Sequence, residues 1–205
     1  GAAVVGLDSH AGMLTRCAAR FDEAGLPVEL ICGDMTAFAL PWRFDRIIIP
    51  YNSLYCLTTD RHQLACLRTA RAHLAPGGLI LLDAYAADPV VGDDATPNVT
   101  ASHPVASFHD GRRQIEVFER SVEDLKAQTI HATYEYQIAW NDGRQETRAW
   151  TIPQRYLFPT QMLALLARAD LALEAFFGDF DEEPLTEMSM QMVVVAGAAS
   201  EAEGD

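Results

Sequence analysis

The chain has 205 residues, 49% of them hydrophobic, and a mean hydropathy of +0.00, which is typical of a globular protein with one substantial core. Its formal net charge is −14, so DNA and RNA are disfavoured as partners, because nucleic-acid binding depends on Lys and Arg that neutralise phosphates. The apolar runs are strand-sized, well short of the roughly 20 residues that a membrane span requires, so no membrane partner is expected.

The first half of the chain alternates strand and helix patterns. Residues 4–7 form an apolar strand, apolar side chains then recur at helical spacing, and Gly25 is expected to end that helix. Further strands are predicted at residues 28–32, 44–49 and 79–82, the last after a Pro-Gly-Gly turn. The β-branched run at residues 44–49 is typical of a strand buried on both faces of a parallel sheet. This alternation predicts an α/β fold with a doubly wound, Rossmann-like, mostly parallel sheet.

The second half begins with a different pattern. Residues 114–119 alternate polar and apolar side chains, residues 130–140 are rich in aromatic and β-branched side chains, and strong turn signals separate such segments. We expect an antiparallel β meander over residues 102–152, inserted into a cofactor-binding α/β domain formed by residues 1–101 and 153–199. A helix at residues 161–169 and strands at 173–177 and 190–196 complete that domain, and residues 200–205 are expected to be a disordered tail.

The four cysteines are Cys17, Cys32, Cys56 and Cys66. Their spacing lacks the paired pattern of a metal site, and no metal site is expected. They lie inside apolar stretches, which predicts buried free thiols in a cytoplasmic protein.

Acidic residues follow three of the predicted parallel strands: Asp8, Asp34 and Asp83. Ligands of open parallel sheets bind beyond the carboxyl ends of the strands, so these side chains should face one crevice. A carboxylate at Asp8 suits the two hydroxyls of a ribose, and one at Asp34 suits an exocyclic amine. Turn chemistry explains such residues as well, and for Asp83 the two interpretations stand even.

Several segments resemble, in order, the motifs of class I S-adenosylmethionine-dependent methyltransferases, especially the small-molecule group with a β lid. They are Val4-Val5-Gly6-Leu7-Asp8-Ser9, Cys32-Gly33-Asp34-Met35, Phe44-Asp45-Arg46-Ile47 with Pro50-Tyr51-Asn52-Ser53-Leu54, Leu74-Ala75-Pro76-Gly77-Gly78-Leu79, and Arg155-Tyr156 with Gly178-Asp179-Phe180. The resemblance covers nearly the whole chain. It implies an antiparallel last strand and makes residues 102–152 the lid over a small-molecule substrate.

The resemblance also implies the cofactor, S-adenosylmethionine, with S-adenosylhomocysteine as product. Asp8 would bind the ribose, Asp34 the adenine amine, and Met35 would line the ring. The cofactor-binding residues expected from these segments are Asp8, Ser9, Met13, Gly33, Asp34, Met35, Pro50 and Asn52.

Methyl transfer requires mainly alignment of a nucleophile with the sulfonium, so few catalytic groups are expected. Tyr51 and Asn52 would face the reaction centre, while the acceptor atom (N, O or C) stays open. Residues expected near the substrate are Tyr55, Tyr85, His103, Arg148 and Arg155. Four aromatic residues of the meander are expected to fill the interface between lid and domain, with an aromatic wall for an organic substrate as the alternative: Tyr134, Tyr136, Trp140 and Trp150.

The glycine-rich first motif of that family is not found in this chain. Counting back about 20 residues from Asp8 puts it before Gly1, so we interpret the chain as lacking the family's first strand, glycine loop and first helix. The loss of a central strand should expose two strand edges. We expect these residues alone to be unstable and inactive, or to pair as a homodimer.

Two other functions remain open at this point. Asp8 alone fits an NAD(P)-dependent oxidoreductase of Rossmann type equally well, although the Gly33-Asp34 strand end and the predicted lid argue against it. A non-catalytic truncated remnant is the second alternative.

Overall fold

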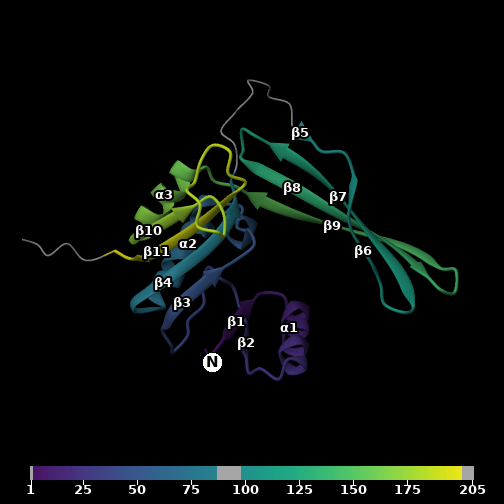
Figure 1. Ribbon diagram of the computed structural model, residues 1–205, viewed down its shortest axis with the longest axis horizontal. Helices are drawn as coiled ribbons and strands as arrows, with labels where there is room; N and C mark the ends of the chain where they lie inside the picture. The colour runs from purple at the N-terminus through teal and green to yellow at the C-terminus, as the bar shows by residue number, and fades with distance from the viewer. Residues whose placement is uncertain (1, 87–97, 200–205) are drawn as a thin grey trace, which may run out of the picture.

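The structure is a computed structural model that describes residues 2–86 and 98–199 (Figure 1). The predicted tail at residues 200–205 lies outside this described part. The described strands belong to three sheets: a parallel pair near the N-terminus, a four-stranded mixed sheet, and a long antiparallel sheet that extends away from the other two (Figure 1). None of the helices in the described part is long and apolar enough to cross a membrane.

The N-terminal unit consists of β1 (Val5–Asp8), α1 (Ala11–Glu23) and β2 (Glu29–Cys32). The two strands are parallel, and their register ends with Asp8 opposite Cys32. Gly25 ends the helix as predicted, because it adopts a φ of +63° that favours glycine. Although the apolar spacing of the helix is correct, α1 contains no buried residue. Among the described residues, no further element buries the apolar side chains of this unit.

The mixed sheet has the strand order β10-β11-β4-β3. Its elements are β3 (Phe44–Ile49), the short 3-10 helix η1 (Ser53–Cys56), α2 (Asp60–Ala72), β4 (Leu74–Tyr85), α3 (Pro159–Arg168), β10 (Leu171–Phe177) and β11 (Gln191–Ala198). Strands β3 and β4 are parallel, whereas β11 is antiparallel to both β4 and β10. Thr59 caps α2, because its side-chain oxygen accepts the His62 N–H.

One face of the mixed sheet carries the main core. Ile80 and Val194 on the sheet and Leu67 of α2 are fully buried there, and α3 packs on the same cluster. Replacing such a side chain by Ala costs about 2–5 kcal/mol, so this face holds the sheet and its two helices together.

The opposite face of the mixed sheet is open. Ile48 of β3 is 66% exposed, and its register neighbours Leu81 of β4 and Val195 of β11 are only partly buried. The prediction that residues 44–49 form a strand buried on both faces is therefore wrong for this face. Strand β3 pairs with β4 only and lies at the sheet edge, so its outer face and one edge face solvent.

Strand β4 is longer than predicted. It begins at Leu74 rather than after the Pro-Gly-Gly sequence, and its register with β3 is interrupted between Leu74 and Leu79. Gly78 lies in this irregular segment, where an added Cβ would be 2.7 Å from the Phe44 carbonyl oxygen. The glycines thus form a bulge inside a strand instead of a turn before it.

The antiparallel sheet has the order β5-β7-β8-β9, with β6 paired to β7. Its strands are β5 (Asn98–Val99), β6 (His103–His109), β7 (Arg113–Asp124), β8 (Thr129–Trp140) and β9 (Gln145–Arg155). A small cluster of Ile115, Val117 and Ile138 stabilises its middle. Ile130 packs against the main core, and β9 contacts η1, so one end of this sheet is attached to the α/β part.

The helix-connected parallel pairs β1–β2 and β3–β4 are those of the predicted Rossmann-like α/β class. They do not form the single continuous sheet that the sequence suggested. In the described part of the chain, β1 pairs with β2 only and β3 with β4 only, so each has one unpaired edge.

Candidate active site

Asp8 and Asp34 follow the carboxyl ends of neighbouring parallel strands, whose ends are tied by the Gly33 N–H donating to the Asp8 carbonyl at 3.1 Å. Asp8 Oδ1 accepts the His10 N–H at 2.7 Å, and Asp34 Oδ1 accepts the N–H and hydroxyl of Thr36, both at 2.8 Å. These bonds from Thr36 lower the pKa of Asp34. Each carboxylate keeps its Oδ2 without a hydrogen-bond partner among the described residues, so each can accept from a ligand.

The other expected cofactor residues of this unit surround the two carboxylates. Ser9 is exposed and accepts a weak bond from the Cys32 thiol at 3.7 Å. Met13 is 52% exposed in the first turn of α1, and Met35 packs against the main core. Free acceptors beside an exposed thioether suit the hydroxyls and ring of a nucleoside, so these residues fit that half of S-adenosylmethionine.

The loop after β3 holds two strained residues. Tyr51 and Asn52 have φ angles of 58° and 59°, a left-handed conformation that costs a non-glycine residue about 1–2 kcal/mol. Asp83 fixes the first by accepting the Tyr51 N–H with both carboxylate oxygens at 3.0 Å. Asn52 Oδ1 accepts the Tyr85 N–H at 2.7 Å. Maintained strain of this kind is typical of functional loops.

This geometry separates the roles of the loop residues. The phenol of Tyr51 is 87% exposed and free to meet a ligand. Asn52 uses its side-chain oxygen to hold β4, which leaves its amide nitrogen as the group that can donate. Pro50 precedes them at the exposed end of β3.

A cluster of tyrosines lies beneath this loop. The rings of Tyr55 and Tyr85 meet edge-on with centroids 5.1 Å apart, and Tyr156 lies 6.1 Å from Tyr85. Tyr55 is 0% exposed, and its hydroxyl donates to the Leu157 carbonyl at 3.1 Å. Tyr55 therefore offers no surface to a substrate, and we assign it to packing.

Tyr85 differs from its neighbour. Its hydroxyl is buried and has no hydrogen-bond partner in the described part of the chain, and burial raises its pKa. The residue also lines a hollow of about 720 Å³ beside the loop between β10 and β11, with Asp179, Glu183 and Met188 among the other lining residues. The expected substrate residue Tyr85 is therefore next to open space at the carboxyl end of β4.

The two arginines expected near the substrate have partners within the protein. Arg155 donates to Oε1 of the fully buried Gln63 at 2.8 Å, and its carbonyl accepts from the same side chain. Arg148 forms an exposed ion pair with Glu146 at 2.5 Å. His103 is exposed on β6, where its Nδ1 lies 3.2 Å from the Ala101 carbonyl oxygen. These contacts give all three residues local roles.

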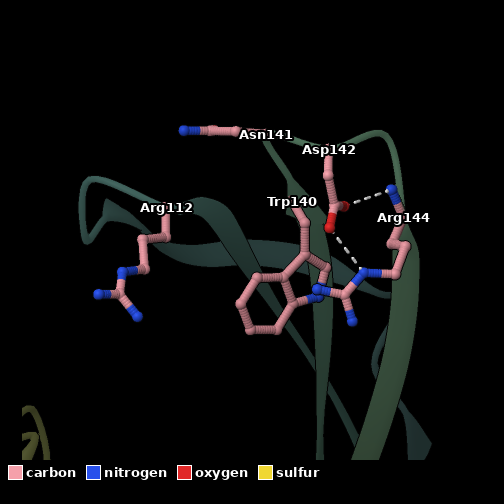
Figure 2. Close-up of a pocket in the computed structure, with 5 residues that line it drawn as sticks. All are labelled: Arg112, Trp140, Asn141, Asp142 and Arg144. Atoms are coloured by element: carbon pink, nitrogen blue, oxygen red, sulfur yellow. Dashed lines mark hydrogen bonds and ion pairs between the residues drawn. The ribbon is translucent and has the colours of Figure 1, made fainter.

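Trp140 is the last residue of β8 and lies at a hairpin end of the antiparallel sheet (Figure 2). It is away from the carboxyl ends of the parallel strands. The guanidinium groups of Arg113 and Arg144 stand over its ring at 4.7 and 4.8 Å from the centroid, and Figure 2 shows the Asp142–Arg144 ion pair beside it. The expectation that Trp140 fills an interface between lid and domain is therefore wrong. Two cations already stabilise this indole within its own sheet.

Sequence reasoning missed Glu119. It stands directly opposite Tyr134 in the register of β7 and β8, and Tyr134 is opposite Trp150 of β9. The available signal was its phase: Ile115 and Val117 occupy the same face, so Glu119 is a charged residue where the alternation calls for an apolar one.

The prediction that the four cysteines are buried free thiols is confirmed only in part. All four are free, but only Cys66 is buried, where burial raises the pKa of its thiol to about 12. Cys32 and Cys56 are exposed because they end β2 and η1 at the surface, and the prediction of buried thiols is wrong for both.

Comparison with known proteins agrees with this arrangement. Residues 1–78 match a family model described as a methyltransferase domain. No curated protein matches the chain.

Solved structures extend the likeness to the whole fold. The CcbJ methyltransferase from Streptomyces caelestis superposes with a TM-score of 0.75 at 24% identity, covering 96% of this chain and 75% of that one. An S-adenosylmethionine-dependent methyltransferase from Clostridium acetobutylicum ATCC 824 gives 0.79 at 12% identity, covering 97% and 76%. The sugar N-methyltransferase KedS8 from Streptoalloteichus sp ATCC 53650 gives 0.66 at 21% identity, covering 96% and 71%.

The fold is thus that of the class I S-adenosylmethionine-dependent methyltransferases. Residues 1–78 also match the methyltransferase-domain model, in agreement with this fold. The fold implied by the sequence resemblance is confirmed, and the oxidoreductase alternative is not favoured.

Proposed function

We propose that the chain transfers a methyl group from S-adenosylmethionine to an amine nitrogen of a sugar or sugar-bearing small molecule. The observation that carries the proposal is the pair of carboxylates at the ends of β1 and β2, each with an oxygen free for a ligand. The nitrogen acceptor is supported by the likeness to KedS8, which is described as a sugar N-methyltransferase.

In this proposal Asp8 accepts from the ribose hydroxyls and Asp34 from the adenine amine, with Ser9, Met13, Gly33 and Met35 around them. The described residues offer no equivalent cradle for the methionine end of the cofactor, apart from Pro50 and the Asn52 amide. S-adenosylmethionine, when bound, supplies an electrophilic methyl group.

The chain's own residues mainly align the acceptor. Tyr51 projects from a loop that Asp83 and Tyr85 hold in a strained conformation, so the backbone that carries its phenol is fixed relative to the strand ends. The acceptor nitrogen forms the new bond to carbon while the carbon–sulfur bond breaks and its electron pair stays on sulfur. Over the whole reaction the nitrogen releases one proton, which leaves before its lone pair attacks when the amine is bound in its protonated form. Fixed alignment of this kind is the main source of rate enhancement for such a displacement.

We further propose that residues 102–152 act as a lid on the α/β domain formed by residues 1–101 and 153–199. Support comes from Ile130, which packs on the main core, and from the contact of β9 with η1 beside the Tyr51 loop. The free cysteines agree with a cytoplasmic location.

The complete sheet of the active protein, we propose, has one more parallel strand between β1 and β3. The unpaired edges of these strands, the exposed Ile48 and the absence of buried residues in α1 support it. Unpaired parallel edges expose rows of N–H and C=O groups. Pairing of two copies through such an edge, as a homodimer, is the competing outcome, and size-exclusion chromatography distinguishes the two.

Calorimetric titration of S-adenosylhomocysteine tests the cofactor assignment. The titration uses the chain itself and a version extended by the coding sequence that precedes Gly1. We expect tight binding by the extended version, loss of that binding on Asp8→Ala or Asp34→Ala, and no loss on Asp22→Ala, an equal charge change on the solvent side of α1. Absence of binding by both forms would overturn the assignment.

A transfer assay tests the acceptor. An amino sugar should accept the methyl group and the matching hydroxy sugar should not. Equal methylation of both would overturn the proposed nitrogen specificity while leaving the methyltransferase assignment intact.

A further inference from the structure

A carboxylate, a phenol and an indole form one continuous row across the antiparallel sheet. Glu119 of β7, Tyr134 of β8 and Trp150 of β9 are direct register partners, so their side chains lie on the same face. Tyr136, on the same face, meets Trp150 edge-on with centroids 5.3 Å apart at 85°. The row therefore combines one negative charge with several aromatic rings.

This face is turned toward the α/β part of the fold. Ile130, on the same face of β8 as Tyr134, packs against the main core, and the neighbouring strand β9 contacts η1. The charge of Glu123, four residues after Glu119 and on the same face, raises the pKa values of Tyr85 and Tyr156, in agreement with this placement. The row therefore lies on the side of the antiparallel sheet that faces the α/β part.

The negative charge in this row has no cation beside it. The ion pairs found within residues 2–86 and 98–199 do not include Glu119, which is half-buried. Arg148 on the same face is already paired with Glu146. Glu119 instead lies next to Tyr134, and burial and the Glu119 charge together raise the pKa of that phenol to about 12. A half-buried carboxylate among aromatic rings favours a cationic ligand.

We propose that Glu119, together with the ring of Tyr134, binds the protonated amine of the acceptor and so selects a cationic substrate. The proposal rests on the function proposed above, since it names how the acceptor nitrogen is recognised. Aromatic faces attract ammonium groups, and the carboxylate adds charge attraction and a hydrogen-bond acceptor for the N–H that must be lost before the lone pair reacts. A neutral hydroxy sugar gains neither interaction.

The test uses two probes of nearly equal shape, choline and its uncharged isostere 3,3-dimethylbutan-1-ol, titrated into the full chain and followed by NMR. Choline should bind at least about tenfold more tightly than the isostere, a ratio that matches a partly desolvated cation–π and charge contact. Glu119→Gln should abolish this preference. Glu116→Gln, the matched change on the opposite and exposed face of β7, should preserve it.

A second pair of variants keeps the test independent of the folding of Glu119→Gln. Tyr134→Phe retains the ring and should keep choline binding within about twofold, whereas Tyr134→Leu should weaken it severalfold. Equal affinity of the wild type for both probes, or full choline binding by Glu119→Gln, overturns the proposal. S-adenosylhomocysteine binding, measured on the same samples, reports on the cofactor site separately, so failure of one proposal is distinguishable from failure of the other.

Discussion

Both carboxylate oxygens of Asp83 lie 3.0 Å from the backbone nitrogen of Tyr51. This contact joins the carboxyl ends of two neighbouring parallel strands, and it holds a tyrosine in a conformation that tyrosine disfavours. In the sequence, Asp83 was equally compatible with a ligand-binding role and with turn chemistry. The structure assigns its carboxylate to the loop, so Asp83 acts through Tyr51.

Removing the Asp83 carboxylate should therefore loosen the loop without affecting the nucleoside site. We expect Asp83→Ala to lower the free energy of unfolding by about 1–3 kcal/mol, the usual cost of losing a charged hydrogen-bond acceptor, and to accelerate exchange of the Tyr51 amide hydrogen. Asp83→Asn keeps one acceptor, so its stability and its Tyr51 exchange rate should lie between those of the wild type and of Asp83→Ala. Amide exchange followed by NMR measures this, with Asp45→Ala on the exposed side of β3 as control. An unchanged Tyr51 exchange rate would contradict the assignment.

The Tyr51→Gly variant tests separately the cost of the strained backbone at this position and the contribution of its side chain to methyl transfer. Glycine adopts a φ of +58° without steric cost, so we expect unchanged or higher stability, by up to about 1 kcal/mol, although the side chain is lost. Methyl transfer by an active form should fall at least tenfold in kcat/KM, about 1.4 kcal/mol, because the phenol aligns the acceptor. Urea unfolding and the transfer assay give the two readouts. A stable variant with full activity would leave Tyr51 without a role in the reaction.

The sequence was sufficient to predict the strand ends that carry Asp8 and Asp34, because β-branched runs and Gly-Asp turns are local signals. Gly25, predicted to end the first helix, has a φ of 63° in the structure. These features depend on a few neighbouring residues, so one sequence suffices to find them.

Features set by distant partners were not predictable in the same way. Ile48 belongs to a run typical of a buried strand, yet its exposure is decided by whether another strand or helix covers β3. Tyr85 lines a hollow, whereas the hydroxyl of Tyr55 donates to the carbonyl of Leu157, 102 residues away in the chain. Glu119 acquires its setting from the register of three strands, and periodicity does not specify register.

Gln63 provides a test of how β9 is attached to α2. Its buried amide donates to the Arg155 carbonyl and accepts from the Arg155 guanidinium, both at 2.8 Å. Gln63→Met, similar in shape, leaves both Arg155 groups without these partners, so we expect a loss of about 1–3 kcal/mol in the free energy of unfolding. Arg61→Met on the exposed face of the same helix is the control and should change stability by under about 0.5 kcal/mol. Coincident urea transitions for both variants would contradict this prediction.

The Asp60–Arg168 ion pair between α2 and α3 predicts a specific pH dependence. Arg168 donates to the two Asp60 oxygens at 2.9 and 2.7 Å, and these bonds hold the pKa of Asp60 below its ordinary value of 3.8. A carboxyl whose pKa is lowered on folding stabilises the protein above its unfolded pKa and loses that contribution as the pH falls through the folded value. Since both side chains are about half exposed, the contribution is only about 0.5 kcal/mol.

Asp60→Asn should therefore be less stable than the wild type by about this amount at pH 7, and the difference should shrink as the pH falls below the ordinary Asp value of 3.8. A double-mutant cycle with Arg168→Gln, measured by urea unfolding at pH 7, 5, 4 and 3, isolates the pair from the effect of the Asp60 charge on the start of α2. The coupling should be constant from pH 7 to 5 and decline below pH 4. A coupling that persists unchanged at pH 3 would show that the carboxylate charge does not hold the two helices together.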